Sequence, residues 1–328
     1  MSPVPVNDYP RTWSEFLDWF SSEDACLAYL ERLRWPQGFI CPSCGAMTAA
    51  PYRASRTRLL CKDCGHQSTV TAGTIFDKTR TPLKVWMAAA WYVTNQKQGV
   101  SALGLQRVLG LGSYQTAWTM LHRFRRAMVR PDRDRLKGVV EVDETYLAIT
   151  DRKQPISPAG RKNNTSKVLI VLAVEILHPK GFGRIRLRRI DKDSEEFIVP
   201  FVQACIEAGS TLKTDGSAAY RALPELGYGH QRNVMLGSDV PAHVSMAGVH
   251  RVASLIKRWI LGTHHGSVQP EHLDAYLDEF VFRFNRRTSS SRGMLFYRLM
   301  QQAVATDPVT YADIVVPAEE SAEIVQWS

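Results

Sequence analysis

The sequence lacks any apolar stretch long enough to cross a membrane. Its longest uncharged apolar run, residues 85–93, is about half of what a membrane-spanning helix needs. The first nine residues lack the basic and then apolar pattern of a signal peptide. Internal repeats and long low-complexity tracts are also missing. We therefore expect a cytoplasmic protein with no membrane partner.

Basic residues are missing from the carboxyl end and abundant elsewhere. No lysine or arginine follows Arg298, whereas that final segment holds five acidic residues. Residues 1–298 carry 41 basic and 27 acidic side chains, a net charge of +14. A basic body fits a polyanionic partner, because phosphate contacts supply affinity that does not depend on sequence. Charge alone is equally compatible with an ordinary basic protein.

Four of the six cysteines have the spacing of a metal site. They form two C-x2-C pairs that are 16 residues apart, and each pair is followed by glycine. This spacing lets four sulfurs reach one tetrahedral Zn²⁺, and without a secretory context disulfides are the weaker interpretation. We expect a structural zinc ribbon held by Cys41, Cys44, Cys61 and Cys64.

Basic residues lie between the two cysteine pairs, on segments that we expect to be strands of the ribbon. We predict that this module presents Arg53, Arg56 and Arg58 to DNA. The alternative is that the ribbon contacts another protein.

Two short helices with serine caps are predicted after the ribbon. Ser101 can begin a helix that ends near Leu109, and Ser113 can begin a second that runs to about Met128. This is the outline of a helix-turn-helix, whose second helix enters the major groove. A helix pair with a solvated basic face is the alternative. The predicted DNA-contacting residues of the second helix are Thr116, Thr119, Arg123 and Arg126.

From residue 137 the hydrophobic pattern is typical of strands. Strand candidates cover residues 138–142, 167–177 and 184–190, followed by a helix from 194 to about 208 and a strand that ends at Asp215. This order of elements is that of the α/β ribonuclease H-like fold, in which the first and fourth strands are neighbours. Asp143 and Asp215 would then lie close together.

These two aspartates, with a histidine from a later helix, have the composition of a two-metal phosphoryl-transfer site. His250 lies in a predicted helix over 249–260, with Lys257 nearly two turns further along the same side. Each residue also has an ordinary explanation: Glu141 could be the ligand in place of Asp143, Asp215 could belong to a turn, and His250 could be a surface or packed histidine. The order of these three residues along the predicted elements favours a metal site over the three separate explanations.

The chain resembles bacterial insertion-sequence transposases of the DDE type that carry an amino-terminal zinc ribbon, the ISXO-like group, whose catalytic domain is retroviral integrase-like. The resemblance covers about residues 12 to 304. The motifs that carry it include Arg34-Trp-Pro-Gln-Gly38, Thr71-Ala-Gly-Thr-Ile-Phe76, Val142-Asp-Glu-Thr-Tyr146, Leu255-Ile-Lys-Arg258, Gly262-Thr-His-His265 and the segment 276–287.

The resemblance implies that Asp143 and Asp215 hold catalytic Mg²⁺ or Mn²⁺, with Lys257 as the associated basic residue. The third position is usually glutamate or asparagine in relatives, and here it is His250, which suits Mn²⁺ better than Mg²⁺. The enzyme is either a working variant or inactive. The intact sequence around His250 favours a working variant. Arg258 would help to position phosphates.

The implied activity is DNA transposition. A homo-oligomer would bind terminal inverted repeats in double-stranded DNA, hydrolyse the 3′ ends and join them to target DNA, in the bacterial cytoplasm in association with the nucleoid. The alternatives are a catalytically inactive regulator that binds DNA and a nuclease without strand transfer. We expect an N-terminal helical segment (1–35), a zinc ribbon (36–75), a helix-turn-helix-like region (76–132), a catalytic domain (137–290) and a C-terminal helix with an acidic tail (291–328).

Overall fold

The protein divides into two compact units. The computed structural model describes residues 8–48, 51–130, 133–150, 165–233 and 245–315. Within these ranges unit 1 comprises residues 8–130 and 288–315, and unit 2 comprises residues 133–287. The C-terminal helices thus belong to the same unit as the ribbon and the N-terminal helices, although the sequence places them after the catalytic region.

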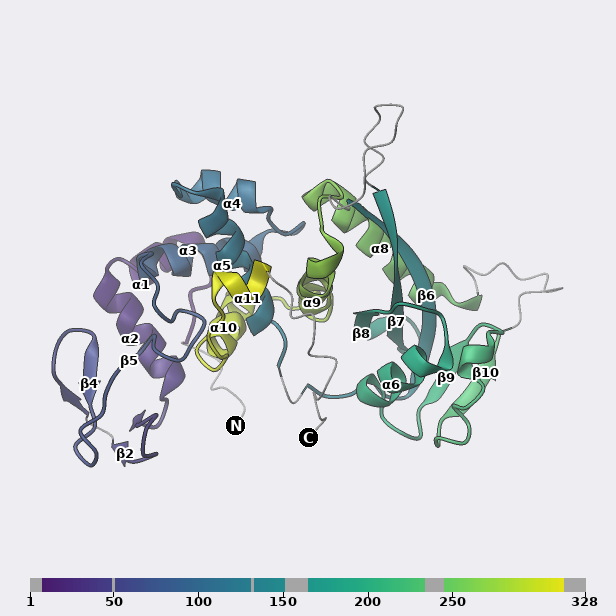
Figure 1. Ribbon diagram of the computed structural model, residues 1–328, viewed down its shortest axis with the longest axis horizontal. Coiled ribbons are helices and arrows are strands. Elements are labelled where there is room, and N and C mark those ends of the chain that lie inside the picture. The colour runs from purple at the N-terminus through teal and green to yellow at the C-terminus, as the bar shows by residue number, and fades with distance from the viewer. Residues whose placement is uncertain (1–7, 49–50, 131–132, 151–164, 234–244, 316–328) are drawn as a thin grey trace. The chain divides into compact units, whose positions relative to one another are not determined.

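Unit 1 is mainly helical (Figure 1). Serine and threonine side chains at Thr12, Ser22, Ser101 and Ser113 accept backbone N–H groups at four helix starts, which fits the expected helix pair. The helices are α1 (Trp13–Trp19), α2 (Glu23–Arg34), α3 (Leu83–Asn95), α4 (Ala102–Leu109), α5 (Tyr114–Ala127), α10 (Arg292–Ala303) and α11 (Tyr311–Val315).

An aromatic cluster joins the two parts of the chain that form unit 1. Phe296 of α10 is fully buried, and its ring contacts those of Phe16, Phe20 and Trp91 at centroid distances of 5.9, 5.6 and 5.7 Å. Such edge-to-face pairs stabilise a core beyond the area that they bury. The C-terminal segment is therefore part of this core.

The ribbon of unit 1 consists of two small antiparallel sheets. One pairs β1 (Phe39–Ile40) with β2 (Met47–Thr48), and the other orders β3 (Tyr52–Arg53), β4 (Arg58–Leu60) and β5 (Gln67–Thr69). These strands are too short to be stable by themselves.

Unit 2 is built on one mixed five-stranded sheet with the order β10-β9-β6-β7-β8. β6, β7 and β8 pair antiparallel, whereas β6, β9 and β10 pair parallel. The expectation that the first and fourth strands of this region are neighbours is confirmed. The strands are β6 (Val139–Thr150), β7 (Thr165–Ile176), β8 (Phe182–Arg189), β9 (Thr211–Thr214) and β10 (Gly229–Arg232).

Helices cover both faces of this sheet (Figure 1). Val140 and Val142 pack on the side of α6 (Glu195–Cys205), whereas Leu147 and Ile149 pack on the side of α8 (Ala247–His264) and α9 (Leu273–Phe284). Odd-numbered side chains of β6 therefore face α8, since a strand alternates with period two. The short 3₁₀ helices are η1 (Ala218–Tyr220) and η2 (Pro270–His272).

The helix predicted over 249–260 is confirmed within α8, whose buried residues include Val249, Val252, Ile256 and Trp259. Among the helices that the structure describes, none is both long and apolar enough to span a bilayer.

Truncation of the central ring of the aromatic cluster should destabilise unit 1. We expect Phe296→Ala to lower the free energy of unfolding by about 3–5 kcal/mol, because it removes a buried ring and leaves a cavity. Leu103→Ala is the control: this side chain is 44% exposed on α4, and its loss should cost less than about 0.5 kcal/mol. Urea unfolding of both variants measures the difference, and equal costs would contradict the role of Phe296.

Candidate active site

Two aspartates lie just beyond the point where β6 and β9 pair in parallel. The last pair of the register is Glu141 with Lys213, and Asp143 and Asp215 each follow two residues later. Asp143 belongs to the face of β6 that α8 covers, because residues two apart on a strand share a face. Asp215 comes directly after β9, and its Oδ1 accepts the N–H of Ser217 at 2.8 Å. The predicted juxtaposition of the two aspartates is therefore present.

The electrostatics of Asp143 show which groups surround it. Burial raises its pKa, the carboxylates of Asp215 and Asp193 add to the rise, and His250 opposes it. Burial and Asp215 likewise raise the pKa of Asp193. Three acidic groups and one imidazole thus lie within electrostatic reach of each other, and a bound cation would relieve the repulsion among the acids.

Asp193 was missed by the sequence analysis. It lies in the segment between β8 and α6, and β8 runs in the same direction as β6 because both pair antiparallel with β7. Segments that follow strands of one direction reach the same edge of a sheet. The signal that could have found Asp193 is therefore its position after a strand parallel to β6.

Glu144 was also missed, and it lies on the opposite face of β6 from Asp143. The hydroxyl of Tyr220 donates a hydrogen bond to its carboxylate. Burial raises the pKa of Glu144 to about 8, and the nearby carboxylates of Asp193, Asp143 and Asp215 add to this. The sequence signal for Glu144 was a pair of consecutive acids in an apolar strand. Consecutive side chains point to opposite faces of a sheet, so one of the two must face the core.

His250 is held by α8, which lies against β6 and β7. It is half-buried in the first turn of that helix, whereas Lys257 and Arg258 are exposed two turns further on. Two carboxylates and an imidazole form a donor set that fits divalent metal ions, and two ions about 3.5–4 Å apart would divide these ligands between them.

Glu141, the alternative ligand, is engaged elsewhere. Its side chain is buried, and Oε2 accepts the backbone N–H groups of Gly248 and Val249 at 2.7 and 3.0 Å. This carboxylate therefore binds the amino-terminal end of α8. The geometry favours Asp143 over Glu141 as the metal ligand.

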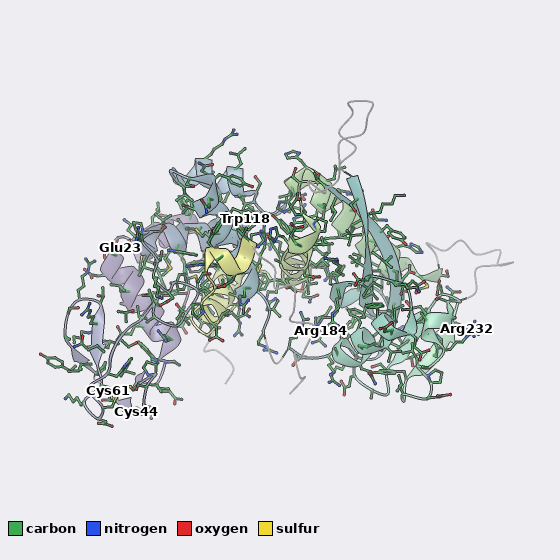
Figure 2. The ribbon with its side chains drawn as sticks, in the orientation of Figure 1. Glu23, Cys44, Cys61, Trp118, Arg184 and Arg232 are labelled. Atoms are coloured by element: carbon green, nitrogen blue, oxygen red, sulfur yellow. The ribbon has the colours of Figure 1, made fainter. Side chains whose placement is uncertain are left out.

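The four predicted zinc ligands form one cluster in the ribbon. Cys41, Cys44, Cys61 and Cys64 have their sulfur atoms within 4.8 Å of one another, with Cys44 and Cys61 labelled in Figure 2. In each pair the N–H of the following glycine donates to the carbonyl of the first cysteine, at 2.9 and 3.0 Å. Both glycines have φ near +75°, a conformation that favours glycine. The four thiols and their two tight turns fit a tetrahedral metal ion.

The three arginines predicted to contact DNA from the ribbon differ in their surroundings. Arg53 donates to both carboxylate oxygens of Glu31 at 2.8 Å, and Arg56 pairs with Asp24, so two of them are held against α2. Within the described part of the chain, the side chain of Arg58 has no such acidic partner.

Arg58 instead lines an open cleft of about 720 Å³ beside the first cysteine pair. Arg34 and His66 line the same cleft with Ser43 and Ser68, and no acidic residue is among the described residues around it. This lining suits an anion.

The predicted recognition face of α5 is less open than the sequence suggested. Arg123 is half-buried and donates to the carbonyl oxygens of Ile75 and Asp77 at 3.0 and 3.5 Å, so its guanidinium supports the loop before α3. The ring of Tyr311 from α11 lies 6.1 Å from that of Trp118 on α5. The side chain of Arg123 is therefore partly engaged within unit 1, whereas Arg126 is exposed. Thr116 and Thr119 line a pocket of about 260 Å³ with Tyr311.

Comparison with known proteins shows which family the chain matches. The model of the ISXO2-like transposase domain matches residues 135–285, and that of the transposase zinc-ribbon domain matches residues 21–67. The chain is 29% identical over 279 residues to an uncharacterized protein in transposable element ISH50 of Halobacterium salinarum, covering 80% of this chain and 91% of that protein.

Two solved structures of Mos1 transposase are also similar. A pre-cleavage Mos1 transpososome matches with 11% identity and a TM-score of 0.25, and a paired-end complex with the left transposon end matches with 14% identity and a TM-score of 0.24. Each match covers 67% of this chain and 75% of the other. The two family models together span more than half of the sequence and agree with the four-cysteine ribbon and the paired aspartates. This chain belongs to the DDE-type insertion-sequence transposases that combine a zinc ribbon with an ISXO2-like transposase domain.

Proposed function

We propose that this protein hydrolyses the 3′ ends of its own insertion sequence and joins them to target DNA. The observation that supports the proposal is the parallel pairing of β6 with β9, whose last pair, Glu141 with Lys213, comes two residues before Asp143 and Asp215. The strand order supports a ribonuclease H-like fold for unit 2.

Asp143, Asp215 and His250 would hold two divalent ions. Bound Mg²⁺ or Mn²⁺ would activate water or a 3′-hydroxyl and stabilise the leaving oxygen of a phosphodiester. The chain itself supplies a rigid strand for Asp143, a strand end for Asp215 and a helix for His250. Imidazole in place of a carboxylate lowers the negative charge of the site and favours Mn²⁺. Lys257 and Arg258, exposed on the same helix, would bind DNA phosphates.

Unit 1 would bind the terminal inverted repeats. The helix pair α4–α5 supports a helix-turn-helix with Thr116, Thr119 and Arg126 as contacts, whereas Arg123 would act mainly as a support. In the ribbon, Arg58 would make a direct phosphate contact from its cleft. Arg53 and Arg56 would contribute less to DNA affinity, because each is already paired with a carboxylate. These exposed ion pairs stabilise the fold by only about 0–1 kcal/mol, so DNA phosphates could replace the carboxylates.

Cleavage and joining at two transposon ends would need a homo-oligomer on DNA. The competing function is an inactive regulator that binds the repeats. That alternative rests on the histidine at position 250, where glutamate or asparagine is usual. A nuclease without strand transfer is the third candidate. An assay that separates binding, cleavage and joining distinguishes all three.

Loss of a metal ligand should abolish chemistry and leave DNA binding intact. We expect Asp143→Ala, Asp215→Ala and His250→Ala each to lower 3′-end cleavage on the order of 10²–10³-fold or more, because each removes electrostatic stabilisation of the transition state. The assay uses DNA that spans the ends flanking the gene, in Mn²⁺ and then in Mg²⁺. His178→Ala is the control, since His178 is an exposed histidine between β7 and β8 that is not proposed to bind metal. Tight binding by wild type without cleavage in either metal would leave only the regulator.

Two arginines of the ribbon should differ in their effect on DNA affinity. We expect Arg58→Ala to reduce the slope of log affinity against log salt by about 0.9, the value for one phosphate contact. Arg53→Ala removes the same charge from the same module but leaves the slope nearly unchanged, because Glu31 already compensates Arg53. Fluorescence anisotropy over a salt series measures both slopes. Equal slopes for the two variants would contradict a phosphate contact by Arg58 in the cleft.

Zinc should be required for the ribbon and for DNA binding. We expect purified protein to contain about one zinc ion per chain, and Cys44→Ser to lose it together with most repeat binding. Cys205→Ala is the control, because this buried cysteine lies in unit 2 outside the cluster. Metal content is measured by atomic emission and binding by gel shift. A zinc-free wild type with full DNA binding would contradict the structural zinc.

A further inference from the structure

The amino-terminal end of α8 is held by a side chain from another element. Its N-cap residue, Met246, makes no side-chain capping hydrogen bond. Glu141 of β6 caps the helix instead, because its Oε2 accepts the N–H groups of Gly248 and Val249, the second and third residues of the helix. The first turn of a helix leaves such N–H groups without partners inside the helix, and a negative charge there is favourable.

The contact requires glycine at position 248. A Cβ atom there would lie 2.8 Å from Oε2 of Glu141 and 2.8 Å from Cδ1 of Ile176, closer than non-bonded atoms approach. The helix backbone therefore comes directly onto the sheet at this point. Glu141 itself is only 4% exposed, so the interaction lies in a dry environment where its loss is costly.

This contact lies between two proposed metal ligands. Asp143 is two residues from Glu141 on the same face of β6, and His250 directly follows Val249 on α8. One carboxylate thus joins the strand of one ligand to the helix turn of another. The distance from Asp143 to His250 depends on it.

We propose that Glu141 is a positioning residue that sets the place of His250 relative to Asp143, and that Gly248 is required for this contact. The inference rests on the proposed function, because it concerns the ligands of that site. Glu141 does not itself bind metal or DNA in this proposal. Its effect is on the affinity of the site for metal, as groups around ligands commonly act.

The chain offers a matched control in the other unit. Glu23 of α2 accepts the N–H groups of Leu83 and Lys84 at the start of α3, both at 2.9 Å, and α3 likewise has no capping side chain at Pro82. Glu23 is labelled in Figure 2. Glu23→Gln and Glu141→Gln therefore weaken the same kind of helix start, but only Glu141 is connected to the site.

The test compares wild type, Glu141→Gln, Glu141→Leu and Glu23→Gln in the full chain. We expect Glu141→Gln to raise the Mn²⁺ concentration for half-maximal cleavage about tenfold, and Glu141→Leu to raise it further because leucine has no acceptor atom. Glu23→Gln should lower the melting temperature without changing the Mn²⁺ requirement. Gly248→Ala should reproduce the effect of Glu141→Leu.

Two measurements without turnover complete the test. Mn²⁺ titration by calorimetry should show the same weakening, and the imidazole NMR signals of His250, assigned from His250→Ala, should shift in metal-free Glu141→Gln but not in Glu23→Gln. A lower melting temperature with unchanged Mn²⁺ affinity and unshifted His250 signals would overturn the positioning role. Wild type that neither binds Mn²⁺ nor cleaves DNA would instead contradict the proposed function, and the His250 signals would still decide the positioning role. If Glu141→Leu does not fold, Glu141→Gln alone decides the outcome.

Discussion

The hydrogen bonds between β6 and β9 set the arrangement on which the candidate site depends. They pair Glu141 with Lys213, and Asp143 and Asp215 each follow two residues later. A shift of the register by one residue would turn the side chains of one strand to the opposite face and change the position of one aspartate relative to the other. Burial of β6 between two hydrophobic clusters prevents such a shift, because Val140 and Val142 fit one cluster and Leu147 and Ile149 fit the other.

Acidic side chains gathered around Asp143 make this unit unusual in a second way. Asp143, Glu144 and Asp193 all have raised pKa values, mainly because burial penalises their charged forms. Repulsion among these groups and Asp215 adds to that cost. A site that accumulates negative charge in this way is destabilised until a cation binds, which is what a metal-dependent enzyme requires. On the same strand, the carboxylate of Glu141 accepts hydrogen bonds from two backbone N–H groups of α8.

The basic residues illustrate why charge alone did not identify DNA contacts. Arg53 and Arg56 are paired with acids of α2, and Arg123 donates to backbone carbonyls. Arg58 differs because it borders a cleft that no acidic residue lines among the described positions. Equal charges in the sequence therefore have unequal access to a phosphate. In unit 1 the fold joins the C-terminal helix α10 to α1 and α3 through Phe296.

Local patterns in the sequence were sufficient for the zinc ligands, the capped helices α4 and α5, the buried face of α8 and the neighbouring first and fourth strands. The zinc ligands and the helices follow from spacing or periodicity within a short segment, whereas the neighbouring strands and the paired aspartates follow from the order of elements along the chain. Tertiary structure alone decided the ion pairs of Arg53 and Arg56, the approach of Asp193 to Asp215, and the contact of Glu141 with Gly248. These interactions join residues from about 20 to more than 100 positions apart. A side chain's partner across such a distance depends on how whole elements pack, and no local pattern of residues encodes it.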